Sequence, residues 1–294
     1  MIDIKQEPQR AVLFGTERVE DHLWGEEPLE ELSRLAETAG AVVTRRLVQR
    51  TKKINPATYI GRGKAEEIKL EIEESDSDLA IFNDELSPTQ ARNLEDLFEI
   101  QVLDRAELIL DIFARHARTT EAKLQVELAQ LEYLLPRLRR MWVHLSRIRG
   151  GIGLRGPGET QLETDRRMIQ KSISVHQRKL ARIESRHALR RKRREGLFNL
   201  ALVGYTNAGK SSLLSNLTGS RVTVRDQLFA TLDTTTRKIA LESGREALLT
   251  DTVGFISRLP HHLVASFKAT LEEVCEADHL LVVVDISNPH YGER

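Results

Sequence analysis

The chain has 294 residues, with 44 Lys and Arg against 44 Asp and Glu, and 40% of its residues are hydrophobic. This length allows two or three domains, each with its own core. The single cysteine, Cys275, excludes an intrachain disulfide and fits a reducing compartment. No apolar run approaches the ~20 residues of a membrane span. The N-terminus has no hydrophobic signal core, so we expect a cytoplasmic protein.

The balanced total charge hides a strongly basic segment. Residues 137–194 contain 18 Lys and Arg but only four Asp and Glu, so the rest of the chain is correspondingly acidic. Arginine exceeds lysine in this segment, and its guanidinium group suits contacts to phosphate. A charged helix is usually just a solvated face, but this one has few acids to pair with its bases. We therefore expect a polyanionic partner at one place, and a nucleic acid is favoured.

Residues 1–105 alternate strand-like and helix-like pieces. The expected strands are 11–14, 41–48, 79–82 and 100–103, and the expected helices are 29–39, 63–74 and 87–98. Ser87 and Pro88 give the last of these helices an N-cap and a proline at its first position. The repeated order of strand and helix predicts an α/β domain, in which helices cover a small parallel sheet.

Residues 106–195 are predicted to form a long antiparallel helical hairpin. Apolar residues first recur at alternating spacings of four and three, at Leu124, Leu128, Leu131, Leu135, Leu138, Trp142 and Leu145. A second and weaker seam of the same spacing runs from Ile169 to His187. Each helix would cover the apolar stripe of the other, with a kink at Pro136. A dimeric coiled coil is the alternative, but the glycine turn and the weaker second seam favour a hairpin in a monomer.

The loop at the tip of this hairpin, residues 150–161, reads GGIGLRGPGETQ, and five of its first nine residues are glycine. A plain connection between two helices needs only a few residues. Glycine allows the backbone to approach a ligand closely, and Arg155 offers several donors to a phosphate or a base edge. We therefore interpret the loop as a recognition element, with a plain connection as the alternative.

A phosphate-binding loop follows the hairpin. Residues 197–203 read as a buried strand, and they lead into GYTNAGKS at 204–211 and then into a helical segment. This matches G-x-x-x-x-G-K-[ST] in the strand–loop–helix context that the motif requires. Backbone N–H groups and the helix N-terminus would surround the phosphates, Lys210 would reach the β and γ phosphates, and Ser211 would bind Mg²⁺. The nucleotide-binding residues predicted here are Gly204, Tyr205, Thr206, Asn207, Ala208, Gly209, Lys210, Ser211 and Ser212.

Two further segments complete the predicted site. In TDTVGF at 250–255, Asp251 would hold Mg²⁺ through water, or else merely cap a turn, and Gly254 would approach a γ phosphate. In LFATLDTTT at 228–236, a threonine would bind Mg²⁺ only when the third phosphate is present, and Thr231 is preferred over Thr235 and Thr236. The nucleotide-binding residues predicted in the two segments are Phe229, Ala230, Thr231, Leu232, Asp233, Asp251, Thr252, Val253 and Gly254. The order of the motifs indicates a Ras-like P-loop domain.

The stretch GGIGLRGPGETQLETDRR at 150–167, followed by GYTNAGKSS, QLFATLD and DTVGFI, closely resembles the HflX family of GTPases. The resemblance covers most of the chain and implies an N-terminal βα domain, a helical hairpin and a GTPase domain that uses GTP, GDP and Mg²⁺. It also implies binding to the large (50S) ribosomal subunit, with the glycine-rich loop reaching ribosomal RNA near the peptidyl-transferase region. Family members are associated with splitting stalled or idle ribosomes. The candidate RNA contacts are Arg149, Arg155, Arg166 and Arg167.

Two features depart from the Ras-like pattern. Phe255 stands where Ras relatives place the glutamine that orients the attacking water. We therefore assign no catalytic residue and expect slow hydrolysis that the ribosome stimulates. The guanine-reading Asn-Lys-x-Asp motif does not occur before Arg294, so we expect the GTPase domain, 197–294, to be incomplete at its C-terminus and to expose a sheet edge. Two alternatives remain, an RNA-binding protein with an inactive GTPase domain and an ATP-using P-loop enzyme that acts on RNA.

Overall fold

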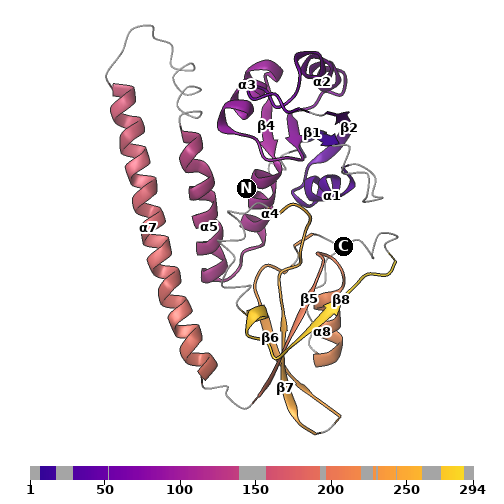
Figure 1. The fold of residues 1–294 in the computed structure, drawn as a ribbon, viewed down its shortest axis with the longest axis vertical. Helices are drawn as coiled ribbons and strands as arrows, with labels where there is room; N and C mark the ends of the chain where they lie inside the picture. The colour runs from indigo at the N-terminus through magenta and orange to yellow at the C-terminus, as the bar shows by residue number, and fades with distance from the viewer. Residues whose placement is uncertain are drawn as a thin grey trace, which may run out of the picture. The chain divides into compact units, whose positions relative to one another are not determined.

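The computed structural model describes nine stretches of the chain in detail. They are residues 7–17, 29–51, 53–138, 157–192, 197–219, 228–229, 231–242, 244–259 and 273–287. The chain divides into two compact units, Met1–Ile112 and Phe113–Arg294, which are described separately below (Figure 1). No helix in the described stretches has the length and apolar character needed to cross a membrane.

The first unit is built on a four-stranded parallel sheet in the order β2-β1-β3-β4. Its strands are β1 (Arg10–Glu17), β2 (Val42–Arg50), β3 (Leu79–Phe82) and β4 (Gln101–Asp104). Its connecting helices are α1 (Glu30–Thr38), α2 (Arg62–Glu74) and α3 (Pro88–Phe98). All four residues of β3 are buried, which explains why this central strand is apolar throughout rather than alternating. The predicted α/β fold with a parallel sheet is confirmed.

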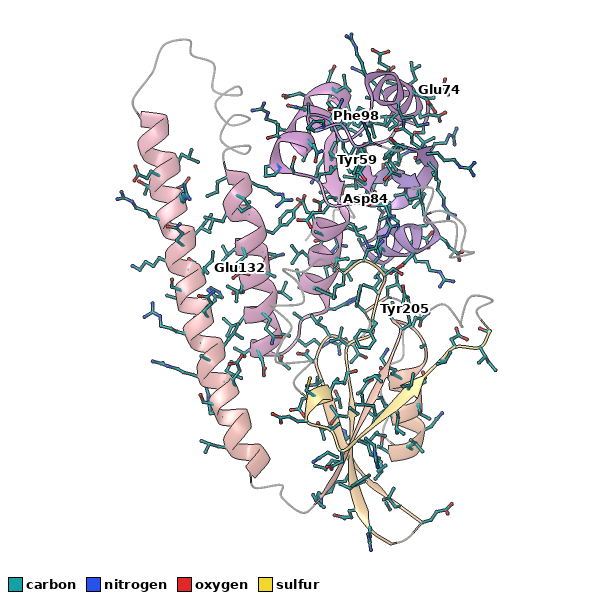
Figure 2. The ribbon with its side chains drawn as sticks, viewed as in Figure 1. Tyr59, Glu74, Asp84, Phe98, Glu132 and Tyr205 are labelled. Atoms are coloured by element: carbon teal, nitrogen blue, oxygen red, sulfur yellow. The ribbon has the colours of Figure 1, made fainter. Side chains whose placement is uncertain are left out.

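Helix α3 begins as the sequence predicts. The Ser87 hydroxyl accepts a hydrogen bond from the Gln90 N–H at 3.2 Å, and the Gln90 side-chain oxygen accepts one from the Ser87 N–H at 2.9 Å. This reciprocal capping satisfies backbone donors at the helix start, and Pro88 occupies the first turn. The helix ends at Phe98, whose ring is buried in the same apolar cluster as Tyr59 (Figure 2). Capping hydrogen bonds therefore fix the start of α3, and packing of the Phe98 ring in the core fixes its end.

In the second unit, the helices α5 (Thr120–Leu134) and α7 (Pro157–Lys192) lie side by side as a hairpin (Figure 1). Leu124 and Leu128 of α5 form one buried cluster with Leu180 of α7. A polar contact reinforces the cluster, because His176 Nε2 of α7 lies 2.8 Å from a carboxylate oxygen of Glu127 on α5. Glu132 on α5 lies on the side that faces α7 (Figure 2). The apolar seam is thus closed within one chain.

The helices differ from the expected hairpin in three places. A separate helix, α4 (Arg105–His116), precedes α5 instead of continuing into it. The seam helix changes to 3-10 geometry at Pro136: α5 ends at Leu134, a single 3-10 turn, η2 (Leu135–Arg137), follows, and Leu138 is α-helical again. Proline has no N–H to donate, which accounts for this interruption. The glycine-rich loop was expected to extend to residue 161, but α7 already begins at Pro157, since proline is favoured in the first turn of a helix. Trp142 and Leu145 lie outside the described residues.

The second sheet has the order β6-β7-β5-β8. Its strands are β5 (Phe198–Gly204), β6 (Thr235–Ala240), β7 (Glu246–Asp251) and β8 (His279–Val283), and helix α8 (Lys210–Thr218) packs on it. Strand β5 pairs in parallel with β7 and β8, while β6 pairs with β7 in antiparallel fashion. Leu214 of α8 is buried against Leu202 and Leu249 of the sheet. Strand β8 lies at the edge, and its Leu280 and Val282 are exposed.

We predict that Leu180→Ala lowers the free energy of unfolding by about 2–3 kcal/mol, because it removes buried methyl groups from the contact between α7 and α5. Denaturant unfolding followed by circular dichroism would measure the change. Leu189→Ala on the same helix is the matched control, because Leu189 is 64% exposed whereas Leu180 is 9% exposed. The control should cost less than about 0.5 kcal/mol. Equal losses from the two variants would show that α7 does not depend on this seam.

Candidate nucleotide site

The parallel pairing of β5 with β7 brings the phosphate loop and Asp251 to the same edge of the sheet. Leu202 of β5 lies opposite Asp251, the last residue of β7. The pairing continues past the ends of both strands, because the Phe255 N–H donates to the Gly204 carbonyl at 3.0 Å. The Thr206 N–H in turn donates to the Phe255 carbonyl at 2.7 Å. Carboxyl ends of parallel strands are where α/β sheets bind ligands.

The phosphate loop turns sharply into α8 and surrounds the Lys210 side chain. Gly209 is the N-cap of α8 and has a φ of 91°, a left-handed conformation that glycine adopts without strain. Lys210 is the first residue of the helix, and its side chain is buried. Its Nζ atom donates to the carbonyl oxygens of Gly204 at 3.1 Å and Tyr205 at 2.7 Å. The loop carbonyls thus hold the ammonium group at the start of α8.

Gly254 is required where the strand after Asp251 passes the phosphate loop. A Cβ atom at this position would lie 2.5 Å from Thr206 Cα and 2.9 Å from Lys210 Nζ. The first of these neighbours is backbone, which cannot move aside as the end of a flexible side chain can. Glycine therefore allows the two motifs to approach each other closely enough to enclose the Lys210 ammonium group.

Three oxygen atoms from three separate motifs meet beside Lys210. The Ser211 hydroxyl donates to Asp251 Oδ2 at 2.5 Å and lies 2.7 Å from Thr231 Oγ1. Asp251 is only 2% exposed, and among the described residues its second oxygen, Oδ1, has no hydrogen-bond partner. Of the three threonines considered from the sequence, Thr231 is thus the one that contacts Ser211. Thr236 instead makes a hydrogen bond to Thr250 at 3.0 Å, and Thr235 lies in β6 opposite Asp251.

Burial shifts the pKa values of both charged groups in this cluster. It lowers the pKa of Lys210 from 10.5 to about 8, and the nearby Asp251 charge offsets only part of this effect. Burial also raises the pKa of Asp251, against the opposing effects of the Ser211 hydrogen bond and the Lys210 charge. Both groups have lost contacts with water, and interactions with the protein replace these contacts only in part. A ligand that brings phosphate charge or a cation would stabilise their charged forms.

Several predicted nucleotide-binding residues use their side chains to hold the site together. Tyr205 makes a short hydrogen bond to the Ser257 hydroxyl, and its hydroxyl also accepts from the Ser257 N–H at 2.7 Å. Thr206 Oγ1 accepts a hydrogen bond from the Phe229 N–H at 2.9 Å. The Thr252 hydroxyl donates to the Leu202 carbonyl at 2.6 Å. These side chains therefore fix the loop and its neighbours rather than pointing freely toward a ligand.

Other predicted site residues lie away from the oxygen cluster or outside the described chain. The side chains of Phe229 and Leu232 are buried, and the Asp233 carboxylate contacts the N-terminus of α5. Asn207 has a φ of 61° in the loop, and Gly204, Ala208 and Ser212 lie in or beside it. Val253 lies between Asp251 and Gly254. Arg166 and Arg167 are exposed on α7. Ala230, Arg149 and Arg155 lie outside the described residues.

Two residues that touch this site were missed by the sequence reading. The ring of Phe113 packs edge-on against Phe229 at 4.6 Å between centroids. Thr119 contacts Asp233 through both its N–H and its hydroxyl. Thr119 caps α5, a role that its position before a helical segment could have indicated. Its partner lies 114 residues further along the chain, and no local pattern relates the two.

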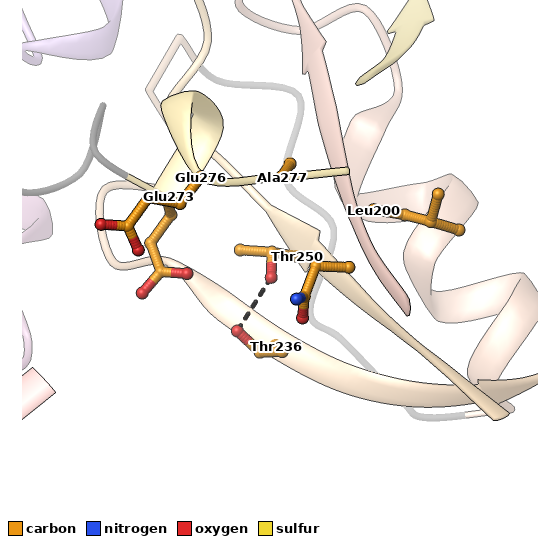
Figure 3. Close-up of a pocket in the computed structure, with 7 residues that line it drawn as sticks. Leu200, Thr236, Thr250, Glu273, Glu276 and Ala277 are labelled. Carbon is orange, nitrogen blue, oxygen red and sulfur yellow. Dashed lines mark hydrogen bonds between the residues drawn. The ribbon is translucent and has the colours of Figure 1, made fainter. Parts of the chain in front are cut away.

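A small cavity of about 90 Å³ lies elsewhere on the second sheet (Figure 3). Thr236 and Thr250 line it, and the dashed line between them is the hydrogen bond described above. Glu273 and Glu276 also line it. Two carboxylates would repel a phosphate group, so this cavity does not suit a nucleotide.

Three family models match the chain in succession. A model described as GTP-binding GTPase N-terminal matches residues 26–114, and one described as GTP-binding GTPase Middle Region matches residues 116–194. A third model, described as 50S ribosome-binding GTPase, matches residues 199–293 and therefore includes the oxygen cluster. Together these matches cover most of the chain.

Individual relatives agree with the family models. The GTPase HflX of Caldanaerobacter subterraneus subsp. tengcongensis is 53% identical over 297 residues, an alignment that spans 100% of this chain and 68% of that protein. The GTPase HflX of Escherichia coli is 50% identical over 270 residues, which span 91% of this chain and 63% of that protein. A solved structure of SsGBP in complex with GDP is 28% identical, with a TM-score of 0.51, and covers 94% of this chain and 71% of that one.

The lowered pKa of Lys210 predicts that affinity for GDP falls as the pH rises through about 8. The unliganded amine loses its proton there, whereas bound phosphate favours the charged form. Binding above this pH must therefore take up a proton, and Kd should rise by up to about tenfold per pH unit. Titration with a fluorescent GDP analogue between about pH 7 and pH 9 would measure the slope. Lys210→Arg keeps its charge over this range and should remove the slope, and a flat profile for the unmodified chain would contradict the prediction.

Proposed function

Because this chain belongs to the HflX family of GTPases, we propose that it acts on the large ribosomal subunit and uses its nucleotide cycle to split stalled or idle ribosomes. GTP hydrolysis is the activity of the family. The observation that carries the assignment to this chain is the oxygen cluster of Ser211, Thr231 and Asp251 beside the buried Lys210. The description of the third family model, 50S ribosome-binding GTPase, supports the partner.

In this proposal the phosphate loop binds the phosphates of GTP or GDP. The Lys210 ammonium group supplies the main positive charge for the β and γ phosphates, and the N-terminus of α8 adds its partial charge. Gly254 passes close to the loop and would offer its N–H to a γ phosphate. The full set of proposed nucleotide-binding residues remains Gly204 to Ser212, Phe229 to Asp233 and Asp251 to Gly254. For Phe229, Leu232 and Asp233 the side chains are engaged elsewhere, so contact would come from the backbone.

We propose Mg²⁺ as the cofactor, held by Ser211 and Thr231 directly and by Asp251 through water. Hydroxyl and carboxylate oxygens are the ligands that Mg²⁺ prefers. The buried Asp251 Oδ1, which has no hydrogen-bond partner among the described residues, fits a water that such an ion would hold. The ion would neutralise charge on the phosphate oxygens. Thr231 would then sense the third phosphate, because its hydroxyl would complete the Mg²⁺ ligands only when that phosphate is present.

We further propose that hydrolysis is slow until the ribosome completes the site. Phe255 follows Gly254 and is 46% exposed, and its ring cannot orient water by hydrogen bonding. No residue of this chain is assigned as a catalytic base. A contact from the large subunit near Phe255 would therefore supply or order the group that positions the attacking water.

The helical hairpin is the proposed RNA-binding element. Its candidate contacts are Arg149 and Arg155, at or near the glycine-rich tip, and Arg166 and Arg167 on α7. Arg167 forms an ion pair with Glu163 at 2.6 Å, but both side chains are mostly exposed, so this pair opposes RNA binding only weakly. RNA phosphates would attract all four arginines.

We propose three functional parts, residues 1–105, residues 106–195 and residues 197–294. The three family models change at nearby positions, and the boundary between the compact units falls at Ile112.

The apolar seam of the hairpin is closed by Leu180 of the same chain, which supports a monomer. Membership of a GTPase family favours GTP, rather than ATP, as the nucleotide of this chain. A cytoplasmic location follows from the proposed ribosomal partner.

We predict that the purified chain hydrolyses GTP slowly and that large ribosomal subunits raise its kcat by about tenfold or more, because they complete the site near Phe255. Phosphate release with and without separated subunits would measure the effect. Lys210→Ala should abolish hydrolysis in both conditions, since the phosphates lose their main cation. Equal rates with and without large subunits would contradict the proposed partner.

We predict that Arg155→Ala impairs ribosome splitting while leaving GDP affinity within about twofold, because the tip lies far along the chain from the phosphate loop. Light scattering of ribosomes mixed with the chain and GTP would follow subunit separation. Arg178→Ala is the control, because Arg178 is an exposed arginine of α7 that is not among the candidate RNA contacts. Unchanged splitting by Arg155→Ala would count against the tip as an RNA-binding element.

A further inference from the structure

The segment that contains Thr231 is attached to the helical hairpin through Asp233. The Asp233 carboxylate accepts hydrogen bonds from the N–H groups of Arg118 and Thr119, each at 3.2 Å. The Thr119 hydroxyl makes a further, short hydrogen bond to the other carboxylate oxygen. These donors lie at the start of α5, where the helix leaves N–H groups without helical partners and carries a partial positive charge. A carboxylate is therefore well matched to this position.

The same segment has a second attachment on the other side of Thr231. Phe229 is 2% exposed, and its ring packs edge-on against Phe113. Its N–H also donates to Thr206 Oγ1 in the phosphate loop at 2.9 Å. Thr231 thus lies two residues from each of two attachments, an apolar contact at Phe229 and a set of hydrogen bonds at Asp233. Between them, its hydroxyl reaches Ser211 at 2.7 Å.

We propose that Thr119 and Asp233 are positioning residues for GTP binding, which hold Thr231 where it would complete the Mg²⁺ and γ-phosphate site. This inference rests on the role proposed above for Thr231. Neither side chain needs to touch the nucleotide. We call the contact between Thr119 and Asp233 the latch.

The latch acts by ordering the segment before the nucleotide arrives. A free segment would have to lose conformational freedom when GTP binds, and this loss would weaken the affinity for GTP. A segment that is already held at both ends loses less conformational freedom when GTP binds. GDP lacks the phosphate that requires Thr231, so its affinity does not depend on the order of the segment. The latch should therefore affect GTP and GDP differently, which a general effect on folding would not do.

The experiment compares Kd values for a non-hydrolysable GTP analogue and for GDP in the full chain, together with KM and kcat for GTP. Asp233→Ala should weaken the GTP analogue by about tenfold, equivalent to about 1.4 kcal/mol, and should leave GDP within about twofold. KM for GTP should rise, with kcat nearly unchanged. Thr119→Ser keeps the hydroxyl and should resemble the unmodified chain. Thr119→Ala should weaken the analogue about threefold, and combining it with Asp233→Ala should add little, because both changes break one contact.

Asp278→Asn is the matched control for the loss of a carboxylate. Asp278 also accepts a hydrogen bond from a backbone N–H, that of Asn199 at 2.8 Å, but at the start of β5 rather than beside the phosphate loop. Asp278→Asn should leave the Kd for the GTP analogue and the Kd for GDP unchanged, and therefore also their ratio. If Asp233→Ala weakens GDP and the GTP analogue equally, or lowers kcat without raising KM, the residue is only structural and the latch proposal is wrong.

Thr231→Ala separates failure of the latch from failure of the underlying site. If Thr231→Ala selectively weakens the GTP analogue and Asp233→Ala does not, Thr231 has its proposed role and the latch is wrong. If Thr231→Ala itself leaves the ratio of the two Kd values unchanged, the role of Thr231 in the nucleotide site is wrong, and the latch proposal falls with it. Selective weakening by both variants supports both proposals.

Discussion

The burial of Lys210 beside Asp251 is the interaction on which the chemistry of the second unit depends. Charged groups are costly to remove from water, and the shifted pKa values of both residues record this cost. The apolar sheet around Leu202 and Leu249 keeps them in place, because parallel pairing of β5 with β7 fixes where both strands end. A site of this kind is only partly satisfied by protein atoms. Phosphate and a divalent cation are the ligands that would restore the missing electrostatic stabilisation.

The parts of the site that could be predicted from the sequence are those whose chemistry is local. The phosphate loop is recognisable because Gly209, Lys210 and Ser211 must stand at fixed spacing to form the turn, the charge and the hydroxyl. The capping of α3 by Ser87 is similarly contained within four residues. Thr231 could be preferred among nearby threonines, although its contact with Ser211 depends on how two distant motifs fold together.

The remaining features depend on tertiary contacts or on a choice between two acceptable local structures. Asp233 reads as one more polar residue of a nucleotide-binding segment, yet its side chain joins a helix whose start lies more than a hundred residues earlier. Pro136 permits either a kink or a break, and here it lies in a single 3-10 turn after which Leu138 is helical again. Pro157 similarly permits either a loop or a first helical turn, and here α7 begins with it. In each case the residue type limits the possibilities but the surrounding packing selects one.

The hydrogen bonds that join Phe255 to Gly204 and Thr206 have a consequence for motion in this domain. Together with the contact between Tyr205 and Ser257, they attach residues 252–257 to the phosphate loop at several points. Residues 252–257 therefore cannot move away from the phosphate loop after the γ phosphate is lost unless several of these hydrogen bonds break at once. Any rearrangement in this part of the chain would begin beyond Ser257, the last residue that these hydrogen bonds hold. Gly254 would then stay beside the phosphate loop throughout the nucleotide cycle.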